Sequence, residues 1–224
     1  MKSKVIRQSL LVSATCLLAL SALPSQASVI SISTRPIAAT ASTSALDYLN
    51  NWNAALSANP TAPAGYCDTT LALYSGVSNQ ASCAGSGGNI SFHFQVDFGV
   101  TAAEAGGWDL RVGPDFGYGG AVFLDGSALS YTSTDMWWNG SYADPSQVFT
   151  ESVLLSAGNH MLDVYGQEGC CDGGQQAQYR SATMRDFQTF SANDGLNAVP
   201  EPTSLALLGL GLAGLASRRR RVIA

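Results

Sequence analysis

Residues 106–126 read GGWDLRVGPDFGYGGAVFLDG, and residues 154–174 read LLSAGNHMLDVYGQEGCCDGG. Apolar and polar residues alternate through the middle of both segments, which is typical of strands buried on one face. Between them, residues 132–142 read TSTDMWWNGSY and contain two adjacent tryptophans. Gly and Asp, which favour turns, fill the loops between the alternating runs. The stretch therefore predicts antiparallel strands joined by short turns.

The same alternation extends outward along the chain. In residues 90–99 one face carries only large apolar residues, and the opposite face carries polar ones: Phe92, Phe94, Val96 and Phe98 against His93, Gln95 and Asp97. Such runs recur about every ten residues with Gly, Asp or Asn between them, as in β-sandwiches. We therefore expect an all-β fold, a single antiparallel β-sandwich over residues 44–198.

One segment of the mature chain has helical spacing. Apolar residues fall at Leu46, Leu49, Trp52 and Leu56, with Pro60 beyond them, which predicts a short N-terminal helix of about three turns. The preceding residues 28–43 are rich in Ser, Thr and Ala. We expect them to form a leader with one edge strand.

The N-terminus has the features of an export signal. Basic residues open the chain, an apolar run covers residues 10–23, and Ser25-Gln26-Ala27 follows with small residues. This order is typical of a secretory signal peptide with an A-x-A-like cleavage site. We predict a signal peptide over residues 1–27, with cleavage after Ala27.

The C-terminus, residues 199–224, combines a proline-rich motif, an apolar run over residues 204–216 and a basic cluster: Val199, Pro200, Glu201, Pro202, and Arg218, Arg219, Arg220 and Arg221. A single C-terminal apolar helix that anchors the chain in the membrane is one interpretation. The arrangement also resembles the PEP-CTERM sorting signal of bacteria that make exopolysaccharide. That resemblance implies transient inner-membrane anchoring, processing by an exosortase after passage through the export machinery, and release to the cell surface or matrix.

Charge is distributed unevenly along the chain. Seven of the eleven basic residues lie in the two terminal segments, so residues 28–200 carry fifteen acidic residues against four arginines, a net charge of −11. Such a surface repels nucleic acid and suits a neutral ligand or a divalent cation. We therefore expect no nucleic-acid partner.

Motifs of the common hydrolases and nucleotide-binding enzymes are absent from the sequence. The two histidines, His93 and His160, have no cysteine or second histidine at metal-ligand spacing. We interpret both as structural residues and expect no enzyme. No carboxylate pair stands out in the sequence as a candidate for glycoside hydrolysis.

Residues 106–180 resemble the middle of PA14-type β-sandwich domains. The resemblance rests on WDLRV at 108–112, on Asp115 in PDFGYGG, on AVFLDG at 121–126 and on AGNH at 157–160. The CCDG at 170–173, with the PEP-CTERM end, also resembles the CCXG group of sorted proteins. The PA14 resemblance implies sugar binding through calcium, with Asp115, Asp172 and Glu168 as ligands. Alternatively, Asp115 and Asp172 serve turns.

Trp137 and Trp138 are neighbours, so on a strand they point to opposite faces. An exposed tryptophan beside Asn139, Ser141 and Tyr142 would suit stacking on a sugar ring. The alternative is that both rings are packed, one in the core and one under a loop.

Four cysteines remain after the signal peptide, which contains Cys16, is removed: Cys67, Cys83, Cys170 and Cys171. In an exported protein an even number favours disulfides. One pairing joins the neighbours Cys170 and Cys171 and leaves Cys67–Cys83. The two crosswise pairings instead join each of Cys67 and Cys83 to one of the two neighbouring cysteines. A zinc site is the third alternative.

These features together predict an exported carbohydrate-binding or adhesive protein of the cell surface or exopolysaccharide matrix, with calcium as the candidate cofactor and polysaccharide as the candidate partner. A structural matrix protein without a defined ligand is the alternative, and a secreted hydrolase is the third.

Overall fold

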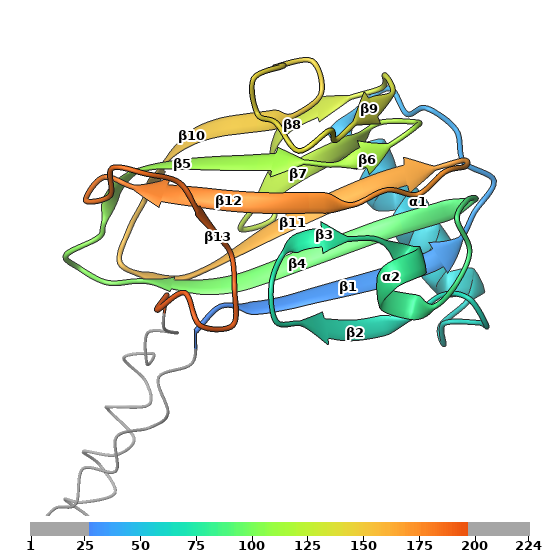
Figure 1. Ribbon diagram of the computed structural model, residues 1–224, viewed down its shortest axis with the longest axis horizontal. Helices are drawn as coiled ribbons and strands as arrows, with labels where there is room; N and C mark the ends of the chain where they lie inside the picture. The colour runs from blue at the N-terminus through green and yellow to red at the C-terminus, as the bar shows by residue number, and fades with distance from the viewer. Residues whose placement is uncertain (1–26, 197–224) are drawn as a thin grey trace, which may run out of the picture.

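The computed structural model describes residues 27–196, which form two packed β-sheets with one helix on the outside (Figure 1). Every neighbouring pair of strands is antiparallel. The larger sheet has the order β2 (Asp68–Leu71), β1 (Val29–Pro36), β4 (Ile90–Val100), β11 (Gly158–Glu168), β7 (Gly120–Leu124) and β8 (Ser127–Thr132). The smaller sheet has the order β10 (Phe149–Leu155), β5 (Gly106–Gly113), β12 (Gln175–Ser181) and β13 (Gln188–Thr189), with β3 (Ser75–Val77) also paired to β12. A separate ribbon pairs β6 (Asp115–Phe116) with β9 (Met136–Trp137).

The core lies between the two sheets and follows the predicted alternation. In the central strand β4, the inward side chains of Phe92, Phe94 and Val96 are fully buried, whereas Asp97 points outward. Facing them from the smaller sheet are Trp108, Leu110 and Tyr179, which are buried as well. The predicted all-β antiparallel sandwich is thus confirmed.

The predicted leader is in fact part of the sandwich. Strand β1 pairs with β4 along its whole length and with β2 on its other side, so it is an interior strand and not an edge strand. Its side chains alternate, and Ile30 and Ile32 enter the core. A half-buried strand alternates apolar and polar residues. In β1 the polar residues are mostly Ser and Thr, so the segment resembled a polar leader in the sequence.

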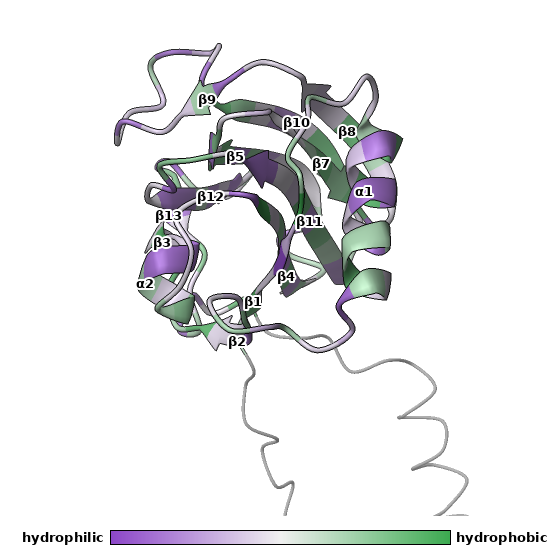
Figure 2. Cartoon of the chain, turned by 90° about the vertical axis from the view of Figure 1, so that its right-hand side faces the viewer, coloured by the Kyte–Doolittle hydropathy of each residue, from purple (hydrophilic) through white to green (hydrophobic). Residues whose placement is uncertain are grey.

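Helix α1 (Ala45–Ala58) covers the outer face of the larger sheet (Figure 2). Ser44 caps it, because its side chain accepts the backbone N–H of Asp47 at 3.2 Å. The packed face is that of Tyr48 and Trp52, whereas Leu46 of the predicted apolar face is exposed. The other predicted apolar residues, Leu49, Trp52 and Leu56, do pack on the sheet, beside Phe123 and Tyr165, and Tyr48 joins them.

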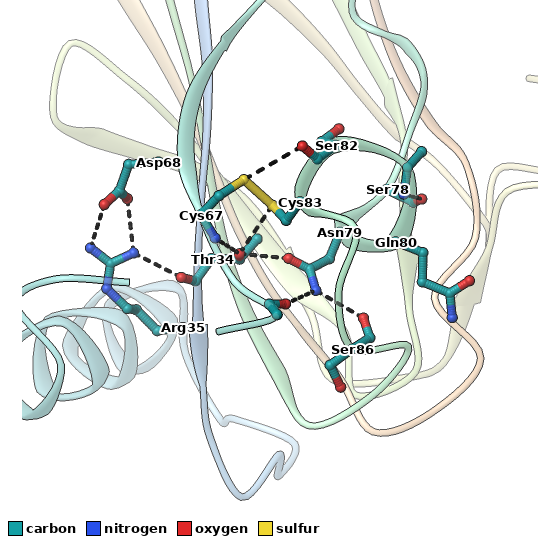
Figure 3. Close-up of a disulfide and its surroundings, with 12 residues drawn as sticks. Thr34, Arg35, Cys67, Asp68, Ser78, Asn79, Gln80, Ser82, Cys83 and Ser86 are labelled. Carbon is teal, nitrogen blue, oxygen red and sulfur yellow. Dashed lines mark hydrogen bonds and ion pairs between the residues drawn. A yellow bond between two sulfur atoms is a disulfide. The ribbon is translucent and has the colours of Figure 1, made fainter. Parts of the chain in front are cut away.

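A second short helix, α2 (Asn79–Cys83), belongs to what we call the braced corner: Thr34, Arg35, Cys67, Asp68, Asn79 and Cys83 (Figure 3). The Cys67–Cys83 disulfide is present, which confirms one predicted bridge and excludes crosswise pairing. Asn79 is fully buried and uses its whole side chain. Its amide nitrogen donates to the carbonyls of Gly65 and Ser86, both at 2.8 Å, and its oxygen accepts the Thr34 hydroxyl at 2.6 Å.

The buried charge of the braced corner is also paired. The Arg35 guanidinium is 1 % exposed and binds both carboxylate oxygens of Asp68 at 2.8 Å. It donates as well to the carbonyls of Asn59 and Thr34. This bidentate pairing with further carbonyls satisfies a cation that would be costly to bury alone.

The two ends of the described chain lie together, where the Ser28 N–H donates to Asp194 at 3.2 Å. The predicted cleavage site at residue 27 borders this end. The apolar run of the predicted signal peptide and the sorting signal lie outside the described residues. Within residues 27–196, neither helix has the length and apolarity that a membrane crossing needs.

Candidate ligand-binding site

An acidic pocket of about 540 Å³ lies where the β6–β9 ribbon meets the end of β11. Figure 1 shows that this end of the sandwich is opposite the end at which the described chain begins and ends. It is lined by a strand-end glutamate, the ribbon, and the loops on either side: Ala39, Asn89, Asp115, Gly117, Tyr118, Asp135, Trp137, Glu168, Gly169, Cys170 and Cys171. All three charged residues of this lining are acidic.

The ribbon separates the two tryptophans, as their adjacency predicts. Asp115 pairs directly with Trp137, a residue that is 65 % exposed and lines the pocket. Trp138 is half-buried and packs against Tyr142, with ring centroids 4.4 Å apart and ring planes tilted by 53°. It also covers Gly113, where a Cβ atom would come within 2.0 Å of the Trp138 ring. Trp137 is thus the tryptophan available to a ligand, and Trp138 has a packing role.

Asp115 and Glu168 are buried carboxylates held by backbone N–H groups. Asp115 accepts the N–H of Gly173 at 2.5 Å. Glu168 accepts the N–H of Gly117 at 2.6 Å through one oxygen and that of Cys170 at 2.8 Å through the other. A Cβ on Gly117 or on Gly173 would lie within 2.8 Å or 2.7 Å of these carboxylate oxygens, so glycine permits the close approach.

Electrostatics set this pocket apart from the rest of the domain. Burial raises the pKa of Asp115 to about 6, and the charges of Glu168 and Asp135 add to the shift. Burial likewise raises the pKa of Glu168, against the opposing effect of its backbone hydrogen bonds. The pocket lining offers no basic side chain to offset these charges. A ligand with hydroxyl or ammonium donors would supply what the lining lacks.

Asp172 lies beside the pocket and not on its lining. One oxygen accepts the N–H of Gln80 in α2 at 2.9 Å, while the other is buried and has no hydrogen-bond partner within residues 27–196. Burial, together with the smaller effects of the Asp115 and Glu168 charges, raises the pKa of Asp172 to about 6. Asp172 thus joins the pocket loop to the braced corner.

The three predicted calcium ligands, Asp115, Glu168 and Asp172, are neighbours but do not form a cation cage. Calcium takes six to eight oxygen ligands. Both Glu168 oxygens already accept backbone N–H groups, and Asp172 is turned toward α2. Over residues 27–196, no three His, Cys, Asp or Glu side chains converge on a point that could hold a metal ion. These residues do not fit calcium as arranged, and calcium binding stays a prediction.

Three further lining residues with polar side chains were not predicted from the sequence: Asn89, Tyr118 and Asp135. Asp135 could have been found, because it stands two residues before Trp137 and strand side chains two apart share a face. Tyr118 lies in the same Gly-rich loop as Asp115. Its carbonyl lies 2.7 Å from the Tyr48 hydroxyl, so α1 helps to hold this loop.

Cys170 and Cys171 line the pocket as exposed residues, with their sulfur atoms 2.6 Å apart. Neither contacts the Cys67–Cys83 bridge of the braced corner, whose sulfurs are already paired. Cys171 has a backbone φ of +72°, which is uncommon for a residue other than glycine.

The two histidines lie away from this pocket. His93 binds Asp163 at 2.8 Å on the outer face of the larger sheet and stacks on Tyr165. His160 binds the turn residue Asp125 at 2.8 Å. Each imidazole is thus bound to a nearby carboxylate, in agreement with a structural role.

Comparisons with known proteins cover the sandwich and the C-terminus separately. Three similar solved structures are the PA14 sugar-binding domain of an RTX adhesin (12% identity, 78% of this chain and 99% of that one, TM-score 0.48), the PA14 domain of the MpAFP antifreeze protein (11%, 73% and 87%, 0.44) and the epithelial adhesin 9 A domain of Candida glabrata in complex with Galb1-4GlcNAc (7%, 76% and 90%, 0.43). No curated protein matches the sequence. The family model of the PEP-CTERM protein-sorting motif matches residues 198–221, which confirms the predicted sorting motif.

Proposed function

We propose that this protein is an exported carbohydrate-binding module of the cell surface or polysaccharide matrix. One observation carries the proposal: a pocket of about 540 Å³ places the exposed ring of Trp137 beside the carboxylates of Asp115, Asp135 and Glu168. The sorting motif at residues 198–221 supports delivery by an exosortase to that location, with transient anchoring in the inner membrane.

The pocket chemistry matches a sugar in two ways. An exposed indole presents a flat apolar face, on which the C–H face of a pyranose ring packs. Carboxylates are acceptor-only groups, so they bind the hydroxyl donors that every sugar carries. Because the charged lining is entirely acidic, uronic acids are repelled, and neutral or amino sugars are favoured.

A direct test is a calorimetric titration of the exported protein with oligosaccharides of neutral sugars, of amino sugars and of uronic acids. We expect neutral or amino sugars to bind and uronic acids not to bind. Trp137→Ala should weaken binding at least about tenfold, or 1.4 kcal/mol, while the melting temperature stays unchanged.

Trp138→Ala is the matched control, because it removes the same ring from the neighbouring position. It should lower the melting temperature through lost packing on Tyr142 and leave the affinity of the folded protein unchanged. Equal sugar affinity of the Trp137→Ala variant and the wild type would show that the sugar does not bind in this pocket. Binding of no sugar at all would favour a structural matrix protein.

Calcium dependence is tested separately by a thermal melt of the exported protein with and without calcium. A ligand that binds only the folded state at a hundredfold excess over its Kd adds about 2.7 kcal/mol. A rise in melting temperature that a chelator reverses, and that Asp115→Asn removes, would establish calcium as a cofactor. An unchanged melt would show that Asp115, Glu168 and Asp172 act without it.

Glycoside hydrolysis is the second candidate function, because Asp115 and Glu168 are buried carboxyls with raised pKa in one pocket. Such a pair is what a general acid and its partner require. It ranks second because both Glu168 oxygens are occupied by backbone N–H groups. Reducing ends released from a bound oligosaccharide, and lost in Asp115→Asn, would establish it; an intact oligosaccharide after prolonged incubation would exclude it.

A further inference from the structure

The two adjacent cysteines at the pocket have no role in the proposal above. The sulfurs of Cys170 and Cys171 are 2.6 Å apart, only about 0.6 Å beyond the length of a disulfide bond. Cys67 and Cys83 are bonded to each other, so each of the pocket cysteines has only its neighbour as a partner among the described residues. In an exported protein such a pair is exposed to oxidants.

The backbone on both sides of the pair is fixed. The Asn89 N–H donates to the Gly169 carbonyl at 3.2 Å before the pair, and the Asp172 N–H donates to the Gly87 carbonyl at 2.9 Å after it. The Cys170 N–H is bound to Glu168 at 2.8 Å. A loop held at both ends keeps the two sulfurs together and stabilises the positive φ of Cys171.

We propose that Cys170 and Cys171 form a vicinal disulfide that serves as one wall of the sugar-binding pocket. This inference rests on the proposed function for its ligand and on the loop geometry for its chemistry. A closed disulfide presents a rigid apolar edge to a sugar ring, whereas two free thiols present mobile, weakly polar groups. Reduction therefore removes a wall of the pocket while the fold remains.

The bond forms by exchange with a small-molecule disulfide outside the cell. One cysteine thiolate attacks a sulfur of that disulfide and releases one small thiolate; the second cysteine thiolate then attacks the mixed disulfide and releases the other. Two protons leave the cysteines and are taken up by the two released thiolates, and the small disulfide is reduced by two electrons.

The surroundings of the pair slow the reduction of the bond once it has formed. The Cys171 sulfur raises the pKa of the Cys170 thiol, and the charges of Glu168 and Asp135 act in the same direction. A thiol of raised pKa is a poor leaving group in exchange, so reduction through departure of Cys170 is slowed. The acidic lining also repels an attacking thiolate.

The bond is tested by alkylating the exported protein without reductant and digesting it with trypsin. Trypsin cleaves after Arg111 and Arg180, and no Lys or Arg lies between them. The resulting peptide of residues 112–180 contains Cys170 and Cys171 and no other cysteine. We expect this peptide to be unalkylated and two hydrogens lighter than its reduced form. Alkylation of both cysteines, or a link to the peptide that ends at Arg111, would overturn the proposal.

The wall is tested by sugar affinity with and without mild reductant. We expect reduction to weaken binding at least tenfold, and re-oxidation with a small disulfide to restore it. Cys170→Ser with Cys171→Ser should bind as weakly as the reduced protein. Cys170→Ser with Cys171→Gly should do the same, although glycine accepts the positive φ without strain.

The outcomes separate this inference from the proposed function. Full sugar affinity in the Cys170→Ser/Cys171→Gly variant would show that binding depends on the loop backbone and not on the disulfide. That result would refute the role of the disulfide as a pocket wall and leave the proposed sugar binding intact. A mapped disulfide with equal affinity before and after reduction would do the same. No sugar binding in either redox state would overturn the proposed function and the wall together, and peptide mapping would still decide the bond.

Discussion

The braced corner and the acidic pocket are two polar regions of one small domain. They differ in whether their buried charged groups are neutralised by an opposite charge. In the corner, every polar atom of Asn79 has a partner, and the buried Arg35 is neutralised by Asp68. In the pocket, Asp115 and Glu168 are buried near each other with no cation on the lining. Beside the pocket, one oxygen of Asp172 is buried with no hydrogen-bond partner among the described residues.

The difference separates stability from binding. Fully satisfied buried polar groups contribute to stability and specify one structure, whereas buried like charges cost stability that folding alone does not recover. A ligand that donates hydrogen bonds to the carboxylates would recover it. The contrast therefore predicts that changes in the corner alter stability, and that changes in the pocket alter binding.

Loss of Asn79 is expected to have the largest effect. Asn79→Ala removes three buried hydrogen bonds and leaves their partners unsatisfied, so unfolding should become easier by about 4 kcal/mol. Urea unfolding measures this change. Gln80→Ala, an exposed position in the same helix, should stay within about 0.5 kcal/mol of the wild type. A similar small loss for Asn79→Ala would contradict the structural role of the corner.

The two cysteine pairs give the next effect. Replacing Cys67 and Cys83 by serine opens a bridge between residues 16 apart and should cost about 3 kcal/mol, because the unfolded chain regains loop entropy. Replacing Cys170 and Cys171 by serine should cost less than about 1 kcal/mol, since a bridge between neighbours closes no loop. Denaturant midpoints of both double variants compare them; equal losses would contradict the distinction.

The pH dependence of stability is the third test. The pKa of both Asp115 and Asp172 rises from an ordinary 3.8 to about 6 in the folded protein, so the folded state binds more protons than the unfolded state between these values. Stability should therefore fall as the pH rises from 4 to 6, and the melting temperature should be higher at pH 4.5 than at pH 7.

Asp115→Asn should flatten this slope and raise the melting temperature at pH 7, because an uncharged side chain relieves the repulsion. Asp144→Asn is the control. Asp144 is exposed, and hydrogen bonds from Ser146 lower its pKa, so this residue changes the pH dependence of stability only below about pH 4. A melting temperature that rises from pH 4 to pH 6 would be opposite in sign to the expected result.

Much of the fold followed from the sequence, because strands buried on one face leave a period of two. The alternation in residues 90–99 predicted the central strand and its inward face. The sequence analysis missed β1 in residues 28–43, because the outward face of that strand is polar. It predicted α1, but it missed that Tyr48 packs on the sheet and that Leu46 is exposed. The sheet surface beneath a helix decides which of the helix residues pack. That surface is formed by strands from distant parts of the chain, so the helix sequence alone does not reveal it.

The site was predicted only in part for the same reason. The adjacency of Trp137 and Trp138 predicted that they would separate, and the Asp115 loop was found through its resemblance. That Asp172 would turn toward α2 depends on a contact between residues 92 apart in the chain. No local pattern encodes such a contact.

The central claim is that Trp137 beside the acidic lining binds a sugar, and tryptophan fluorescence tests it most directly. Trp52 and Trp108 are buried and Trp138 is half-buried, so Trp137 is the exposed reporter in the described part of the chain. Titration with a neutral or amino oligosaccharide should change the emission and protect it from acrylamide, and Trp137→Phe should abolish both responses. An undiminished response in Trp137→Phe, or none in the wild type with any sugar, would contradict the account.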